Sequence, residues 1–304
     1  MENLPVDYFT STSAYTPHVH RDQYPAIDPA APQNSQAGRV VIVTGASAGI
    51  GAQGFAPAFA RANAKAIVLV GRNQAKLDST AAEVKKINSH VEVITSSTEI
   101  NDEAAVAKLY ETIKEKLGYA TVLINNAGVW AEQAPLISST TDKWWMDFEI
   151  NVKGTYLMTK GFVSLLGAER KGYVVSMNTG IAGMVAPTMS SYSISKTAEL
   201  RLVEYFVAEH SNVQHISLQP GIVPTAMVVD SFKKFALDTP ELVGGVGVWL
   251  STDTADFLNG RFVSANWDVE DLMKMKEKIV SGNDLKMVYQ GRFGLDHFSE
   301  EERR

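Results

Sequence analysis

The chain has 304 residues, of which 45% are hydrophobic and 20% are charged, and it contains no cysteine. Its 28 Lys and Arg and 34 Asp and Glu give a formal net charge of −6 at pH 7. These proportions are typical of a globular protein and exclude wholesale disorder. The lack of cysteine excludes disulfide scaffolds, thiolate metal sites and cysteine nucleophiles, and the acidic balance argues against nucleic acid as a partner.

No apolar run reaches the ~18 residues that a membrane span needs. The start of the chain has neither a basic segment nor an apolar run of the kind found in secretory signals. The sequence therefore predicts a cytoplasmic protein without a membrane span.

Residues 1–37 contain five prolines and follow neither a helical nor a strand period, which predicts an irregular N-terminal arm. The arm is either a disordered tail or a segment that lies across the rest of the protein. In the second case aromatic side chains would anchor it: Tyr8, Phe9, Tyr15 and Tyr24. His18 and His20 also lie here, but no third histidine and no carboxylate stands beside them. A solvated arm is therefore expected rather than a metal site.

Residues 38–265 alternate between short apolar runs and longer amphipathic stretches. The short runs are rich in β-branched residues and predict strands at 40–43, 66–70, 91–95, 121–124, 173–177, 215–219 and 261–264. The longer stretches predict helices at about 50–64, 75–88, 103–117, 141–166, 191–209 and 242–250. Repeated β–α units predict one α/β domain in which helices cover both faces of a parallel sheet.

Residues 266–304 form a charged C-terminal extension. Its composition predicts a surface helix followed by a loose end. Two aromatic side chains in it, Trp267 and Tyr289, could instead cover a cleft or contact a second subunit, and the sequence leaves this open.

The strand at 40–43 leads into the glycine-rich segment 44–51, and a helix follows. A pyrophosphate binds unpaired N–H groups at the start of a helix, and Gly45, Gly49 and Gly51 would leave room for that approach. Gly51 would also allow the helix to pack closely on the strand. Glycines alone can mark an ordinary turn, but the strand–turn–helix context favours a dinucleotide site.

The residue that follows the second strand of such a fold reads the adenosine ribose. A carboxylate there would bind the 2′-hydroxyl of NAD, whereas this chain has Gly71, Arg72 and Asn73. An arginine at this place can pair with the 2′-phosphate of NADP. The alternative is a surface arginine at the start of the next helix. We therefore expect NADP(H) as the preferred cofactor, with NAD(H) as the second choice.

Tyr192 and Lys196 are four residues apart in a predicted helix, so both project from one face. A free phenol has a pKa near 10, and a neighbouring ammonium favours the phenolate and lowers that pKa towards working pH. The same spacing also occurs on ordinary amphipathic helices. Other motifs must therefore support a catalytic role.

Five elements occur in one order: segment 44–51, Asn125 to Gly128 after a strand, Asn151, the Tyr192–Lys196 pair, and Pro220 with Gly221. Together they resemble the short-chain dehydrogenase/reductase family over about residues 38–265. The flanking segments 24–27 and 260–268 are similar to those of fungal members. The resemblance implies a single Rossmann-type, doubly wound parallel sheet and a homodimer or homotetramer.

The resemblance also implies residue roles. Tyr192 would be the general acid or base, Lys196 would hold the nicotinamide ribose and lower the pKa of Tyr192, and Asn151 would belong to a water-linked proton relay. The implied cofactor-binding set is Gly45, Ser47, Gly49, Ile50, Gly51, Arg72, Asn73, Glu99, Asn125, Ala127, Gly128, Tyr192, Lys196, Pro220, Gly221, Val223 and Thr225. Glu99 stands where the family often has an aspartate against the adenine.

One position departs from the family pattern. The substrate-orienting serine usually stands thirteen residues before the tyrosine, and here that residue is Thr179. It keeps a hydroxyl that could bond the substrate carbonyl, but its extra methyl crowds the site and stiffens the side chain. Non-redox chemistry, such as a cyclase or dehydratase, and nucleotide binding without turnover therefore stay as alternatives.

The loops expected around the substrate are rich in large apolar residues: Trp130, Met184, Met189, Met227 and Val228. They predict a lipophilic carbonyl or alcohol as substrate, because no Arg or Lys stands clearly among them. Residues 232–235, after the Pro-Gly turn, predict a mobile helical lid. The sequence thus favours an NADP(H)-dependent oxidoreductase that interconverts a carbonyl and a secondary alcohol.

Overall fold

The computed structural model describes residues 3–291 and 293–303. In that part of the chain seven strands form one parallel sheet, in the order β3-β2-β1-β4-β5-β6-β7. The strands are β1 (Val40–Thr44), β2 (Ala66–Gly71), β3 (Glu92–Ser97), β4 (Val122–Asn125), β5 (Gly172–Met177), β6 (Val213–Gln219) and β7 (Phe262–Ser264). The predicted doubly wound sheet is confirmed, and each strand boundary lies within two residues of its prediction.

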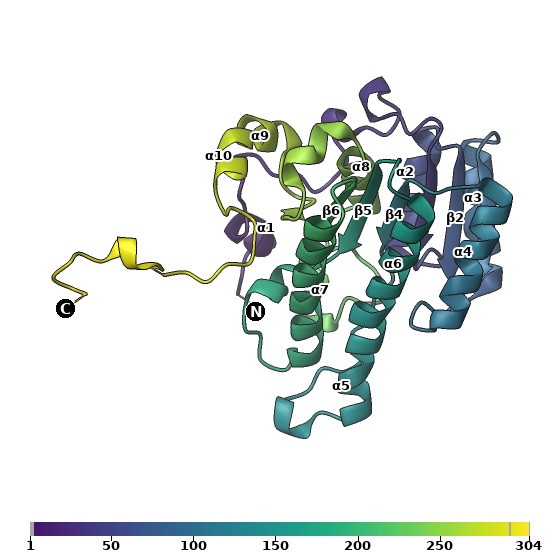
Figure 1. The fold of residues 1–304 in the computed structure, drawn as a ribbon. Helices are drawn as coiled ribbons and strands as arrows, with labels where there is room; N and C mark the ends of the chain where they lie inside the picture. The colour runs from purple at the N-terminus through teal and green to yellow at the C-terminus, as the bar shows by residue number, and fades with distance from the viewer. Residues whose placement is uncertain (1–2, 292, 304) are drawn as a thin grey trace.

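Helices cover both faces of the sheet (Figure 1). The α-helices are α1 (Tyr8–Thr12), α2 (Ala56–Arg61), α3 (Gln74–Ile87), α4 (Glu103–Leu117), α5 (Thr141–Asp147), α6 (Thr155–Leu166), α7 (Ser190–Glu209), α8 (Pro240–Leu250), α9 (Val269–Lys274) and α10 (Lys276–Ser281). Shorter 3-10 helices are η1 (Pro25–Ile27), η2 (Pro32–Asn34), η4 (Leu136–Ser138), η6 (Gly180–Gly183), η7 (Asp230–Phe235), η8 (Asp253–Leu258) and η9 (Leu295–His297). None of the described helices is long and apolar enough to cross a membrane.

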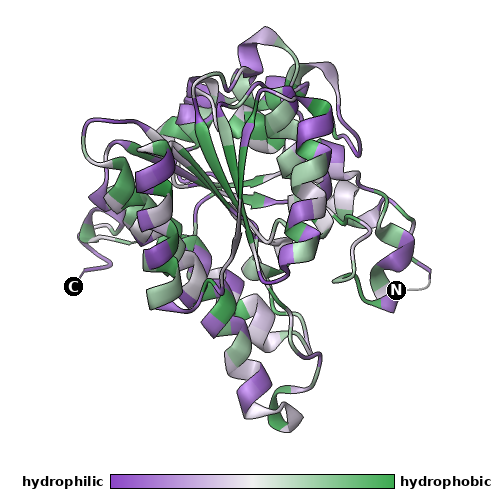
Figure 2. Cartoon of the chain, turned by 90° about the vertical axis from the view of Figure 1, so that its right-hand side faces the viewer, coloured by the Kyte–Doolittle hydropathy of each residue, from purple (hydrophilic) through white to green (hydrophobic). Residues whose placement is uncertain are grey.

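The core lies in two layers, one on each face of the sheet. Residues of α2, α3 and α8 pack on one face, and residues of α4 and α6 pack on the other. All residues of β1 and β2 are buried, because a parallel sheet that is covered on both sides has no solvent face. Figure 2 shows the hydrophobic strands between helices whose outer faces are hydrophilic.

Two predicted helices are interrupted by π-helical turns. The helix predicted at 50–64 begins as η3 (Gly51–Phe55) before α2, and the helix predicted at 141–166 divides into α5, η5 (Phe148–Gly154) and α6. Such turns occur mostly inside α-helices and are frequent at functional sites. Both turns contain residues of the predicted site: η3 begins at Gly51 of the glycine-rich segment, and η5 contains Asn151.

The N-terminal arm lies across the body and pairs with the C-terminal segment. Val19 forms an antiparallel bridge with Trp267. On either side of it, His18 Nδ1 lies 2.7 Å from Asp271 Oδ2, and His20 Nε2 lies 2.7 Å from Asp268 Oδ2. The fold thus brings one carboxylate to each histidine from some 250 residues away, although none stands beside them in the sequence, and the His18 side chain stays 73% exposed.

The segment predicted as a lid is the 3-10 helix η7, and the arm packs against it. The ring of Phe9 lies 5.3 Å from the ring of Phe232 and 4.8 Å from that of Phe235. Lys234 Nζ donates to the Leu4 carbonyl at 2.9 Å. The N-terminal arm therefore holds η7 against the body.

Trp267 joins the arm to the C-terminal segment. Its side chain is buried, its ring lies 5.4 Å from that of Tyr15, and its Nε1 donates to the Ser13 carbonyl at 2.9 Å. Tyr289, the other aromatic residue of the extension, is 91% exposed. The sequence left the roles of these two residues open, and the structure gives them opposite environments.

We predict that Trp267→Ala lowers the free energy of unfolding by about 3–5 kcal/mol, because it leaves a large cavity under the arm. Urea unfolding measures this loss, and limited proteolysis should detect faster cleavage within residues 1–37. Tyr289→Ala is the matched control and should change neither result. Equal stability of the two variants would contradict the anchoring role of Trp267.

Candidate active site

The main cavity has a volume of about 710 Å³ and lies beyond the carboxyl ends of β1, β2, β4 and β5. In a doubly wound sheet this edge is where ligands bind, at the point where the strand order reverses. The predicted site residues that line it are Gly45, Ser47, Gly49, Ile50, Arg72, Glu99, Ala127, Gly128, Tyr192, Lys196, Pro220 and Thr225. The structure thus brings most of the predicted set into one cavity.

The glycine-rich turn is held against the end of β4. Thr44 Oγ1 accepts hydrogen bonds from the backbone N–H groups of Asn126 and Ala127, both at 3.0 Å. Asn126 Nδ2 donates to the carbonyl oxygens of Thr44 at 2.9 Å and Gly45 at 3.3 Å. Asn126 also lines the cavity. It belongs to the segment Asn125 to Gly128, but the sequence pattern predicted no role for it.

Three predicted glycines are required by the backbone geometry of this turn. Gly45 and Gly49 have φ angles of +65° and +55°, which L side chains rarely adopt. A Cβ atom on Gly51 would lie 2.5 Å from the Gly45 carbonyl oxygen. The turn can therefore adopt this conformation only with glycine at these places.

Five predicted cofactor residues are not in the cavity wall and instead support it. Asn73 caps α3 by accepting from Lys76 N at 3.0 Å, and Asn125 Nδ2 donates to Thr159 and Ser176. The others are Gly51 in the turn just described, Gly221 with φ of +78° beside Asp238, and the buried Val223.

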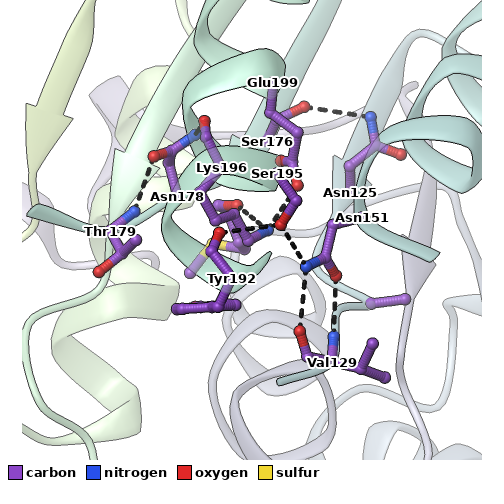
Figure 3. A network of polar contacts seen from close by, with 12 residues as sticks. Asn125, Val129, Asn151, Ser176, Asn178, Thr179, Tyr192, Ser195, Lys196 and Glu199 are labelled. Carbon is purple, nitrogen blue, oxygen red and sulfur yellow. Dashed lines mark hydrogen bonds and ion pairs between the residues drawn. The ribbon is translucent and has the colours of Figure 1, made fainter. Parts of the chain in front are cut away.

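Lys196 lies in α7 and is almost fully buried. Its Nζ donates to the Met177 carbonyl at 2.8 Å and to Glu199 Oε1 at 2.7 Å (Figure 3). A Cβ atom on Gly128 would lie 3.6 Å from this Nζ and 3.3 Å from Asn151 Oδ1. The glycine therefore keeps the floor of the cavity open at Lys196.

Tyr192 lies one turn before Lys196, and its ring stacks on Trp130 with a centroid distance of 5.6 Å. Burial raises the pKa of the Tyr192 phenol above its ordinary value, and the carboxylates of Glu199 and Asp147 raise it further. The sequence predicted the opposite direction, from the charge of Lys196. The difference arises first from burial of the phenol and then from Glu199, which forms an ion pair with that ammonium.

Asn151 is fully buried in η5 and contacts the loop after β4. Its Oδ1 accepts from Val129 N at 2.9 Å, and its Nδ2 donates to the Val129 carbonyl and to Ser195 Oγ, both at 3.0 Å. Ser195 Oγ in turn donates to the Tyr192 carbonyl at 2.8 Å (Figure 3). Asn151 thus ties the cavity wall at Val129 to the helical turn that carries Tyr192.

Thr179 lies apart from the other predicted catalytic residues. It lines a second cavity of about 320 Å³, which we call the side cavity, while its neighbour Asn178 lines the main cavity. Successive residues of an extended chain point to opposite sides, so the end of β5 can expose only one of the two. Thr179 Oγ1 accepts from Ile181 N at 3.4 Å and begins η6.

One part of the wall of the main cavity is formed by α5, which projects from the body (Figure 1). Trp145, Met146 and Met227 supply apolar surface, and Asp142 and Glu149 supply carboxylates. Of the apolar residues that the sequence proposed, only Met227 lines this part of the wall, whereas Met184 lines the side cavity. The α5 residues were missed because α5 was predicted as part of one long helix.

We predict that Gly51→Ala lowers the free energy of unfolding by about 1–3 kcal/mol, because the added methyl overpacks the turn. It should also weaken NADPH binding by at least about tenfold, since Gly45 must move. Thermal unfolding and calorimetry measure the two effects. Gly183→Ala, where a Cβ meets no atom within 4 Å, is the control. A Gly51→Ala variant as stable as the parent would refute the close packing.

The residues of the main cavity fit a nicotinamide dinucleotide. Its glycine-rich turn carries no side chains at Gly45, Gly49 and Gly51, its volume accommodates a large ligand, and Arg72 lines the same cavity as Tyr192 and Lys196. Among the described residues no three His, Asp or Glu side chains converge as a metal site would require.

Comparison with known proteins agrees with this geometry. The model of the short chain dehydrogenase family matches residues 39–235. The short chain dehydrogenase citE of Monascus ruber is 36% identical over 277 residues, which cover 88% of this chain and 94% of citE. The short chain dehydrogenase andI of Emericella variicolor is 32% identical over 279 residues, with 88% and 94% covered.

Solved structures share the fold. A levodione reductase superposes with a TM-score of 0.70 at 24% identity over 76% of this chain and 96% of its own. A short chain dehydrogenase from Shigella flexneri, complexed with NADP, superposes with a TM-score of 0.69 at 24% identity over 77% and 99%. With the family match over most of the chain, these likenesses lead to one conclusion: the protein belongs to the short-chain dehydrogenase/reductase family and is an NAD(P)-dependent oxidoreductase.

Proposed function

We propose that this protein is an NADP(H)-dependent oxidoreductase that interconverts a carbonyl and a secondary alcohol on a lipophilic small molecule. One observation carries the proposal: a single cavity of about 710 Å³ joins the glycine-rich turn and Arg72 to Tyr192 and Lys196. The first pair of features suits a phosphorylated dinucleotide, and the second pair suits proton transfer to a substrate oxygen.

The preference for NADP(H) rests on the end of β2. Arg72 is exposed at the mouth of the cavity, and the first two positions after the strand hold no carboxylate that would repel a 2′-phosphate. Arginine binds phosphate with two parallel hydrogen bonds and always carries charge. A short chain dehydrogenase from Escherichia coli CFT073 that shares the fold is complexed with NADPH, which supports the same choice. NAD(H) would lack the phosphate that Arg72 can bind.

A bound nicotinamide supplies the hydride that adds to the carbonyl carbon. Tyr192 would then donate its phenolic proton to the carbonyl oxygen, which gives the alcohol and leaves a phenolate. The Tyr192 phenol is protonated at neutral pH, which is the form a proton donor needs, although its raised pKa makes it a weaker acid than an ordinary tyrosine. Lys196 would hold the nicotinamide ribose, and Asn151 keeps the Val129 loop and the Tyr192 turn in register.

The proposed substrate class rests on the residues of α5 and on Glu149 and Met227, which line the same cavity as Tyr192. Trp145, Met146 and Met227 favour an apolar ligand, whereas the carboxylates of Asp142 and Glu149 disfavour an anionic one. A neutral lipophilic ketone or alcohol therefore fits better than a sugar phosphate or a small acid.

We predict that Arg72→Ala weakens NADPH binding by about 10–100-fold, the usual size of a lost hydrogen bond to a charged group, and changes NADH binding little. Calorimetric titration with each nucleotide measures the two affinities. Lys76→Ala, which removes one positive charge from the following helix, is the matched control. Equal losses of affinity for both nucleotides would refute the 2′-phosphate assignment. If the parent protein bound neither nucleotide, the proposed redox function would be refuted.

We predict that Tyr192→Phe lowers the turnover number by about 10²–10⁴-fold, the usual contribution of general acid catalysis, while NADPH affinity is kept. NADPH-dependent reduction of a panel of lipophilic ketones measures turnover. Tyr205→Phe is the control, because Tyr205 lies on the same helix and is 61% exposed. Undiminished turnover in Tyr192→Phe would exclude Tyr192 as the proton donor and favour one of the non-redox alternatives.

A further inference from the structure

Glu199 forms a buried ion pair with Lys196 on the cavity-forming helix α7. Its Oε1 lies 2.7 Å from Lys196 Nζ, and the two side chains are 1% and 5% exposed. Lys196 is also held by the Met177 carbonyl at 2.8 Å, so its ammonium lies between two oxygen acceptors (Figure 3). This arrangement fixes the position of the ammonium one helical turn from Tyr192.

Stability alone does not call for a buried ion pair here, although Lys196 without Glu199 would be a costly uncompensated charge. Removing two charges from water is costly, and well-packed apolar side chains often replace a buried ion pair without loss of stability. The next residue, Leu200, is itself a buried apolar side chain of the same helix. The role of Glu199 therefore follows from its contact with Lys196.

We propose that Glu199 is a positioning residue for the Tyr192–Lys196 pair: its carboxylate holds the Lys196 ammonium at the Met177 carbonyl and compensates the charge of that ammonium. This inference rests on the proposed function, because it assigns Tyr192 the role of proton donor. It adds a residue to that function: by compensating the ammonium charge, Glu199 limits how far Lys196 can lower the pKa of the Tyr192 phenol.

Tyr192 and Lys196 lie on α7 with Glu199, and Lys196 is the charged group in direct contact with it. The elements packed against α7 carry further titratable groups: His215 on β6, Asp147 on α5, and the surface ion pair Glu149–Lys153 on η5. Burial lowers the pKa of His215 to about 3, so it stays neutral at working pH. Burial also raises the pKa of Asp147, whose carboxylate accepts from Ser191 and Ala131.

Glu199 is the member of this group that changes charge near neutrality. Burial raises its pKa to about 7, although Lys196 lowers it. Above that pH the ionised Glu199 compensates the Lys196 charge and opposes formation of the Tyr192 phenolate. Below it the protonated Glu199 leaves the ammonium uncompensated, which favours the phenolate.

The first experiment uses the nucleotide-free protein. The carboxyl carbons of ¹³C-labelled glutamate are titrated by NMR, and the Glu199 signal is assigned by its loss in Glu199→Gln. We expect a midpoint near 7, against about 4.3 for an ordinary glutamate. In Lys196→Met the midpoint should rise, because the compensating charge is gone. A midpoint that Lys196→Met leaves unchanged would overturn the proposal, because the carboxyl and the ammonium would then not be coupled.

The second experiment follows alcohol oxidation, with 1-tetralol and NADP⁺ as the probe pair, as a function of pH. The acid limb of the rate profile reports ionisation of Tyr192. In Glu199→Gln it should move to lower pH by on the order of one unit, because one negative charge beside the phenol is removed. An unshifted profile with merely reduced rates would indicate a structural role and overturn the proposal.

Glu204→Gln is the matched control for the rate profile. It removes a carboxylate from the same helix, where Glu204 pairs with Arg201, and it should leave the profile unchanged. The two experiments separate the failure modes. If the parent oxidises no alcohol, the proposed function fails, while the carboxyl titration still decides whether Glu199 and Lys196 are coupled. If Glu199→Gln does not fold, the titration of the parent and of Lys196→Met decides.

Discussion

The close approach of β1 and β4 at their carboxyl ends is the constraint on which the site depends. The strand order reverses between these two neighbours, so the helices that follow them lie on opposite faces and leave a crevice. Thr44 and Asn126 join the two strand ends by hydrogen bonds, and Gly45 and Gly51 allow the backbones to meet without a Cβ between them. Every other part of the main cavity is arranged around this junction.

A second level of organisation is the buried polar network that extends from the junction to α7. Asn151 links the loop at Val129 to Ser195, and the same helix carries Tyr192, Lys196 and Glu199. Because charges interact strongly where water is excluded, the balance between one ammonium and its neighbouring carboxylates controls the protonation of the phenol. The packing of α7 therefore determines both the positions of these side chains and the protonation of the phenol.

The N-terminal arm and the C-terminal segment form a further layer that supports the loop after β6. Trp267, the two His–Asp pairs and Phe9 join these distant parts of the chain. Arg21 and Asn266 both contact Asp238, whose carboxylate accepts from the backbone of Ile222. The segment that follows Pro220 and Gly221 is thus held by residues that lie outside the region matched by the family model, residues 39–235.

The sequence by itself determined the doubly wound sheet and most of the cavity wall. Runs of β-branched residues buried on both faces mark parallel strands, and the glycine-rich turn and the Tyr192–Lys196 spacing are local patterns. Only the tertiary structure decided which side chains meet. Lys196 and Glu199 are three residues apart in the sequence, but their burial, and hence the direction of the Tyr192 pKa, depends on packing of α7. Likewise Thr179 faces the side cavity, and His18 meets Asp271 from the far end of the chain. Side-chain direction, long-range contact and desolvation are properties of the folded chain, so local sequence does not contain them.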